Sequence, residues 1–318
     1  MIDVRDVPIR SSFVSTAVGK CFRLAKLQIE NPLEKKPHYF LGGSVFALMM
    51  EEYHRSGYCG DIHEFAATCI HICMQEENYS ATEDQVLLII DRCATAFIEY
   101  IDWVPNSGLK IIGSEIEVRS VTDGGRECAI KVDILAVDKN QKIYMLDAKT
   151  FGMWGASISA SVVTTEQLRM SLQVAMYSWF LERGGDMYVG QTIGRTETNA
   201  EVAARCESIP GRIKPDFVGY INVAMLTRRK RTTKNGKAGD RRGNPLTVIP
   251  YDVAMKEYAK EQINAVELMM TFNQWPRVQK FERGYSTCLG CQFKKDCWDG
   301  RATPSAAPSW LDKKTETR

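Results

Sequence analysis

Two aspartates and a lysine occur in a short stretch whose pattern predicts a β-hairpin. Residues 129–150 alternate apolar and polar side chains and return after a polar turn near Asn140. Side chains two residues apart in a strand share a face, so Asp147 and Lys149 leave the returning strand on the same side. If the turn is centred on Asn140, Asp133 lies opposite Asp147 on that side. The spacing therefore predicts that two carboxylates and an ammonium group converge.

Converging carboxylates are costly unless a cation lies between them, because like charges repel and burial removes their water. Oxygen ligands favour Mg²⁺ or Mn²⁺. A lysine beside such a cation can orient a water molecule and stabilise charge on a phosphate under attack. The alternative interpretation is an exposed hairpin whose outer face carries ordinary charges.

This order of residues resembles the signature of the PD-(D/E)xK nuclease superfamily, in which an acidic residue is followed by a second acidic residue, any residue and a lysine. The proline of the signature is absent, as is common in the RecB-like branch. The matching positions are Asp133, Asp147, Ala148 and Lys149.

A second RecB-like element follows at residues 166–182, which form a predicted helix. Gln173 and Tyr177 are four residues apart and share a face of that helix. They resemble the QxxxY element, which contacts DNA beside the metals in RecB-like nucleases. Packing of an amphipathic helix would also explain this stretch.

Three cysteines near the C-terminus, Cys288, Cys291 and Cys297, are spaced as C-x₂-C-x₅-C. Three thiolates need a soft metal and leave a four-ligand site one ligand short. The pattern resembles RecB-like nucleases of the AddB and CRISPR-associated types, in which one early and three late cysteines hold a [4Fe–4S] cluster. Cys21, followed by Phe22 and Arg23, fits the early position, so the resemblance implies a cluster that clasps the two ends of the domain.

The glycine-led helix near residue 43 departs from the family pattern. RecB-like enzymes carry a metal-binding histidine four residues after the glycine, and Ala47 stands in that place here. Glu51 is one turn further on and faces the same way, so it is a candidate substitute ligand. The resemblance thus implies a metal site drawn from Asp133, Asp147, the backbone of Ala148, and Glu51.

A strongly basic stretch at residues 227–245 connects two predicted strands, 216–226 and 246–251. Its functional interpretation is a phosphate-contacting arm, and its alternative is a solvated loop. The candidate nucleic-acid contacts are Arg228, Arg229, Lys230, Arg231, Arg241 and Arg242.

The whole-chain properties are those of an ordinary globular protein, with 318 residues, 44% hydrophobic residues and a net charge of +2. No export signal or membrane-length apolar run occurs, which predicts an intracellular protein. A group of cysteines and histidines at residues 59–73 is predicted to be core packing, because it lacks a C-x₂-C pair. We expect one domain at residues 1–300, with a helical part near 40–105, an iron–sulfur segment near 280–300 and a flexible tail at 301–318.

The fold expected from the resemblance is α/β, a restriction-endonuclease-like mixed sheet flanked by helices. The implied activity is metal-dependent hydrolysis of DNA, exonucleolytic on single-stranded ends, with recombination or replication proteins as possible partners. Two alternatives remain open: an iron–sulfur DNA-binding module with weakened catalysis, suggested by Ala47, and a non-nuclease protein with structural zinc.

Overall fold

The computed structural model describes most of the chain up to residue 275. The described residues are 3–30, 36–58, 60–76, 79–150, 163–191, 193, 196–223, 245–275, 291 and 293. Cys288, Cys297 and the six basic residues of the predicted arm lie outside them. No described helix is long and apolar enough to cross a membrane.

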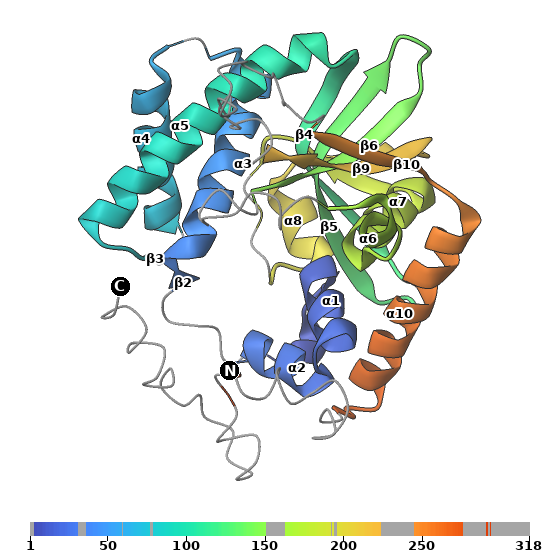
Figure 1. The fold of residues 1–318 in the computed structure, drawn as a ribbon. Helices are drawn as coiled ribbons and strands as arrows, with labels where there is room; N and C mark the ends of the chain where they lie inside the picture. Colours follow the sequence, from blue (N-terminus) through green and yellow to red (C-terminus); the bar gives the residue numbers. More distant parts are fainter. Residues whose placement is uncertain are drawn as a thin grey trace.

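A mixed sheet of eight described strands forms the centre of the molecule (Figure 1). Its order is β10, β9, β6, β5, β4, β7 and β8, and β1 pairs with β5. The hairpin strands β5 and β6 are antiparallel, whereas β6 and β9 are parallel. The strands are β1 Ile9–Arg10, β4 Leu109–Val121, β5 Glu127–Asp138, β6 Ile143–Lys149, β7 Gly185–Tyr188, β8 Ile209–Gly211, β9 Phe217–Asn222 and β10 Leu246–Pro250.

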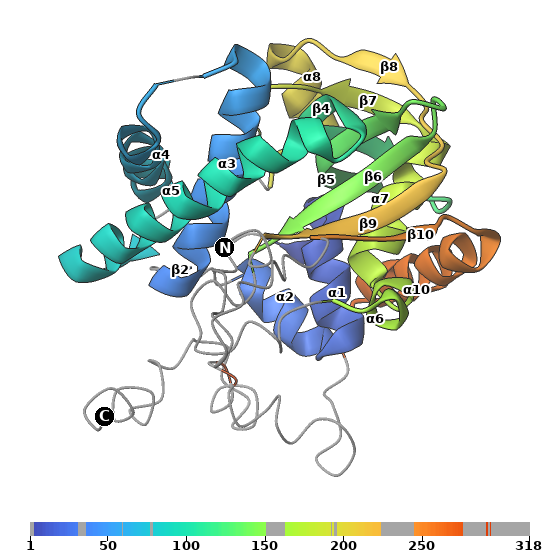
Figure 2. The same ribbon diagram turned by 45° about the horizontal axis from the view of Figure 1, so that its top comes forward.

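Helices cover both faces of the sheet (Figures 1 and 2). Ile134 and Leu146 point into a core shared with α3, α4 and α5. Val132 and Met145 point into the opposite core, shared with α1, α7 and α10. All four side chains are fully buried, and each such burial contributes about 1.5–3 kcal/mol. The helices are α1 Ser11–Gly19, α2 Phe22–Glu30, α3 His38–Ser56, α4 Ile62–Glu76, α5 Glu83–Asn106, α6 Thr165–Arg169, α7 Leu172–Arg183, α8 Asn199–Arg205 and α10 Val253–Thr271; a short second sheet pairs β2 Lys36–Pro37 with β3 Tyr79–Ser80.

Two parts of the chain take a course that the sequence does not indicate. The strand beginning at Leu109 would be expected from the sequence at an edge of the sheet, but β4 lies between β5 and β7. Residues 186–215 supply α8, most of β7 and all of β8, and the two strands extend the central sheet. These strands have only three or four residues, which is too short for an alternating pattern to reveal them.

Of the cysteines and histidines at residues 59–73, Cys69 and Cys73 pack in the core as predicted, whereas His63 and His71 are exposed and Cys59 lies outside the described residues. Cys69 and Cys73 are buried in the core between α3, α4 and α5, beside Phe65 and Phe97. Burial raises the pKa of Cys69 to about 12, so its thiol stays protonated. Within the described residues, no group of three or more His, Cys, Asp and Glu side chains forms a metal cluster.

His54 provides a pH-dependent contact between α3 and α5. Its Nε2 lies 2.8 Å from the hydroxyl of Tyr100, and burial lowers the pKa of His54 to about 4. A histidine whose folded-state pKa is lowered stabilises the fold above its unfolded pKa of 6.5, and this stability is lost as the pH falls toward 4.

Between pH 7 and 4.5, we expect the free energy of unfolding of wild type to fall by about 2 kcal/mol more than that of His54→Gln, after allowance for solvent screening. Urea unfolding measures this difference. His63→Gln, at an exposed position, is the control, and an equal loss in wild type and His54→Gln would contradict this assignment.

Candidate active site

The hairpin register brings the two aspartates together as predicted. Leu135 is opposite Met145 and Ile134, the last paired residue, is opposite Leu146; extending this register by one residue puts Asp133 opposite Asp147. The register is set by the turn centred near Asn140, where Asp138 accepts backbone hydrogen bonds from Asn140 and Lys142.

The two carboxyl groups form an unfavourable pair, in which Asp147 is 1% exposed and Asp133 is partly buried. Asp133 Oδ2 accepts a 2.9 Å hydrogen bond from the backbone N–H of Ala148, the neighbour of Asp147. Burial, and then the charge of Asp147, raise the pKa of Asp133 well above its usual value. Burial also raises the pKa of Asp147, although Lys149 opposes the shift. Without a cation the pair therefore retains a proton at pH values where a free aspartate has lost it.

Gln173 connects the carboxylate pair to the lysine. Its Nε2 donates to Asp147 Oδ1 at 2.8 Å and to the Tyr177 hydroxyl at 2.9 Å. Its Oε1 accepts from Lys149 Nζ at 2.8 Å, while Lys149 also forms an ion pair with Asp147. Asp147, Lys149, Gln173 and Tyr177 thus form one connected group of polar side chains, and Asp133 lies beside it, held by the backbone N–H of Ala148.

The position of Gln173 depends on a break in the helix that was predicted at residues 166–182. The chain forms two helices there, because the side chain of Ser171 caps the N-terminus of α7 by accepting from the backbone N–H of Val174. Gln173 consequently occupies the first turn of α7, next to the end of β6. Ser11, at the start of α1, donates a long 3.4 Å hydrogen bond to Tyr177 and supports the same group from the other side.

A third acidic residue, Glu115, lies beside Asp133. Ser114 pairs with Ile134 and Ile116 with Val132, which places Glu115 across from Asp133. Its backbone φ of 51° is unusual for a non-glycine residue, and its negative charge contributes to the raised pKa of Asp133. Glu115 is paired with Lys131 at 2.6 Å. Glu117, two residues further along β4, instead pairs with Arg10 and Arg119.

The glycine-led helix α3 runs past the carboxylates. Gly43 is close to Thr150 at the end of β6, and the charges acting most strongly on Glu51 come from Lys131 and Glu115. Ala47 is one helical turn from each, on the same face, and so lies between these two contacts. Glu51 is therefore placed beside Glu115, and burial raises its pKa.

The donor set fits a magnesium-type cation better than a zinc-type one. Asp133 and Asp147 offer neighbouring carboxylate oxygens, whereas the backbone group by which Ala148 contacts Asp133 is its N–H, which is not a metal ligand. Mg²⁺ commonly uses one or two carboxylates and completes its shell with waters and substrate phosphates, whereas structural zinc takes four protein ligands. The raised pKa values of the pair show a local need for positive charge beyond that of Lys149.

The described cysteines divide by exposure. Cys69, Cys73, Cys93 and Cys128 are buried, whereas Cys21, Cys206 and Cys291 are partly exposed. Cys21 lies in the break between α1 and α2. The two described members of the predicted cluster set, Cys21 and Cys291, are thus both partly exposed.

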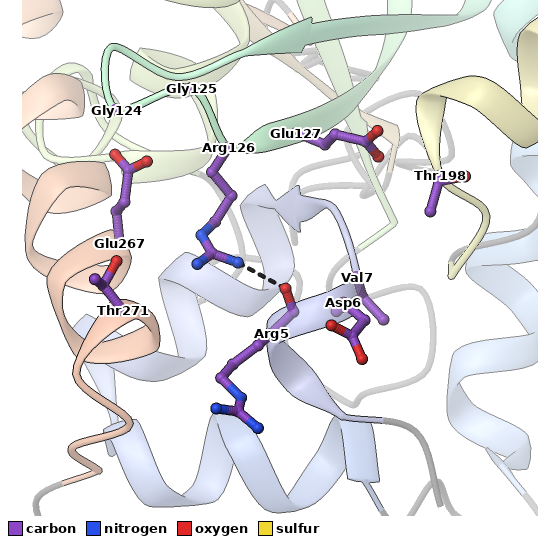
Figure 3. A pocket seen from close by; sticks show the side chains of 10 residues that line it. All are labelled: Arg5, Asp6, Val7, Gly124, Gly125, Arg126, Glu127, Thr198, Glu267 and Thr271. Atoms are coloured by element: carbon purple, nitrogen blue, oxygen red, sulfur yellow. Dashed lines mark hydrogen bonds between the residues drawn. The ribbon is translucent and has the colours of Figure 1, made fainter.

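Two cavities lie outside the carboxylate group. One of about 540 Å³ is lined by polar residues of the N-terminus, the β4–β5 turn and α10, and none of the predicted site residues lines it (Figure 3). Arg126 donates across it to the backbone oxygen of Arg5 at 2.6 Å. Another, of about 200 Å³, is bordered by Glu51, His54 and Arg55.

Comparison with known proteins gives no family assignment. No protein-family model and no curated protein matches the sequence. Among solved structures, a candidate exonuclease from Eubacterium rectale is similar with a TM-score of 0.43 and 11% identity, over 98% of this chain and 95% of that one. A protein named SSO0001 is similar with a TM-score of 0.28 and 12% identity, over 86% of this chain and 92% of that one. Both TM-scores are too low to support an argument about function.

Proposed function

We propose that the protein is a metal-dependent nuclease that hydrolyses DNA phosphodiester bonds. The supporting observation is the bridge made by Gln173, which holds the Lys149 ammonium group against Asp147 while Asp133 lies directly opposite. A buried carboxylate pair with an oriented lysine is suited to a reaction in which negative charge develops on a phosphate.

In this proposal Asp133 and Asp147 hold Mg²⁺ or Mn²⁺, which when bound supplies charge neutralisation at the phosphate and makes water a stronger acid. Lys149 donates a hydrogen bond to the attacking water or to a phosphate oxygen. Gln173 fixes the direction of that ammonium group, and Tyr177 fixes Gln173. Glu115 and Glu51 add negative charge next to the pair and favour cation binding.

The proposed substrate is single-stranded DNA with a free end, as the resemblance to RecB-like nucleases implies. The basic residues Arg228, Arg229, Lys230, Arg231, Arg241 and Arg242 would contact phosphates, and recombination or replication proteins would be partners. Linear and circular single strands of equal length test this choice. An exonuclease degrades only the linear strand in Mn²⁺, while cleavage of both at equal rates would point to an endonuclease.

The proposed cofactor at the other end of the domain is a [4Fe–4S] cluster held by Cys21, Cys288, Cys291 and Cys297. Its support is the spacing of the cysteines and the exposure of Cys21 and Cys291. Cys21→Ser is expected to remove most of the iron and the visible absorbance of anaerobically purified protein, and to lower its stability. Cys206→Ser is the control, because Cys206 is the other partly exposed cysteine among the described residues. Unchanged iron in Cys21→Ser would place the fourth ligand elsewhere.

Ala47 supports a second candidate, a DNA-binding module with weakened catalysis. It stands at the sequence position where the resemblance implies a metal-binding histidine, so the cation would keep more water ligands. DNA binding without measurable cleavage in either Mg²⁺ or Mn²⁺ would favour this candidate.

A further inference from the structure

Tyr220 lies directly under the catalytic lysine of the proposed mechanism, at a position that no sequence motif indicates. It belongs to β9, which runs parallel to β6, and it is in register with Asp147. Its side chain is 5% exposed. The Lys149 Nζ atom lies 5.2 Å from the centre of the Tyr220 ring, within the range of a cation–π contact.

The hydroxyl group of Tyr220 reaches the same lysine by a second route. It is hydrogen bonded to the hydroxyl of Ser171, the residue that caps α7. Gln173 follows two residues later and accepts the hydrogen bond from Lys149. The ring of Tyr220 therefore contacts Lys149 directly, and its hydroxyl group positions the helix end that carries Gln173.

We propose that Tyr220 is a positioning residue that fixes the direction of the Lys149 ammonium group, an inference that rests on the proposed nuclease function. A lysine has a flexible four-carbon stem, and its compact charge can turn toward any nearby acceptor. Here the ammonium group is enclosed by three partners: the carboxylate of Asp147, the amide oxygen of Gln173 and the ring of Tyr220. The ring attracts the ammonium group and takes the place of water on that side, so the lysine side chain is held in one direction.

Substitutions distinguish the contact of the Tyr220 ring with Lys149 from the hydrogen bond of the Tyr220 hydroxyl with Ser171. Tyr220→Leu removes both, and we expect kcat on single-stranded DNA in Mn²⁺ to fall about 100-fold with little change in KM, because a displaced catalytic group mainly affects the reacting geometry. Tyr220→Phe keeps the ring and should lose less than about tenfold. Ser171→Ala removes the same hydrogen bond from the other side. The double variant Ser171→Ala/Tyr220→Phe should therefore be no worse than the more impaired single variant.

A spectroscopic measurement distinguishes positioning from general stability and does not depend on activity. In protein labelled with ¹³C-lysine, the ε-methylene protons of Lys149 should be shifted upfield by the ring current of Tyr220, with the signal assigned from Lys149→Arg. Tyr220→Phe should keep this shift and Tyr220→Leu should lose it. Tyr251→Leu is the matched control, since Tyr251 is hydrogen bonded to Glu182 near the opposite end of α7.

The results distinguish this inference from the proposed function. If wild type cleaves no DNA but the Lys149 signal is shifted, the nuclease proposal fails while the ring contact stands. An unshifted Lys149 signal in wild type, or equal loss of kcat in Tyr251→Leu and Tyr220→Leu, would overturn the positioning role. If Tyr220→Leu does not fold, two other measurements still test the positioning role. These are the Lys149 chemical shift in wild type and the comparison of kcat between the double variant Ser171→Ala/Tyr220→Phe and its two single variants.

Discussion

Replacing Lys149 with methionine is expected to abolish DNA cleavage and to destabilise the metal-free protein. Lys149 forms an ion pair with Asp147, whose side chain is only 2% exposed, and the Lys149 side chain itself is only 18% exposed. Removing one partner of a buried ion pair costs about 3–5 kcal/mol, because the remaining charge is left without compensation. Loss of the ammonium group should also lower the cleavage rate by at least about 10²- to 10³-fold.

Mn²⁺ provides an internal test of that prediction. A divalent cation between Asp133 and Asp147 would replace the missing positive charge, so Mn²⁺ should restore much of the thermal stability of Lys149→Met without restoring cleavage. The matched control is Lys142→Met, in the same hairpin, where the lysine forms an exposed ion pair with Asp216. Equal melting temperatures for Lys149→Met with and without Mn²⁺ would argue against a cation between the aspartates.

Asp147→Asn should have the opposite effect on stability while also abolishing cleavage. The pKa of Asp147 is raised by burial, and a carboxyl group with a raised folded-state pKa stabilises the fold fully only below its unfolded pKa of 3.8. This contribution is lost as the pH rises through the folded-state pKa, so at neutral pH the uncharged amide is the better-tolerated side chain. We expect metal-free Asp147→Asn to be more stable than wild type at pH 7, by about 1 kcal/mol.

The advantage of Asp147→Asn should disappear at low pH and in the presence of Mn²⁺. Below pH 4 wild type carries a protonated carboxyl group at this position, and with Mn²⁺ bound its charge is compensated. Urea unfolding at pH 7 and at pH 3.5, with and without Mn²⁺, measures all these differences. Asp186→Asn, an exposed substitution on β7, is the control. Lower stability of Asp147→Asn in every condition would show that the pair is not under electrostatic strain.

The parts of the site that could be predicted from the sequence depend on local geometry. Asp133 and Asp147 are equidistant from Asn140, so a hairpin with a centred turn puts them opposite each other. Gln173 and Tyr177 are four apart in a helix, so they share a face and form a hydrogen bond.

The parts that could not be predicted depend on pairings between distant segments. Tyr220 meets Lys149 only because β9 adds to the sheet parallel to β6, and nothing near residue 220 indicates that register. Glu115 lies across from Asp133 with a positive backbone φ, a conformation that is uncommon outside glycine and that the sequence does not indicate. The short strand β7 pairs with β4, and β8 pairs with β7, so both depend on partners distant in the sequence, and their own sequences carry little signal.

Release of nucleotides from end-labelled single-stranded DNA, measured for wild type and Asp147→Asn purified side by side, tests the central claim most directly. Wild type should cleave in Mn²⁺ and stop when EDTA is added, and Asp147→Asn should release nothing although it is folded. Absence of cleavage by folded wild-type protein in both Mg²⁺ and Mn²⁺, or equal rates for the two proteins, would contradict the assignment of this site to DNA hydrolysis.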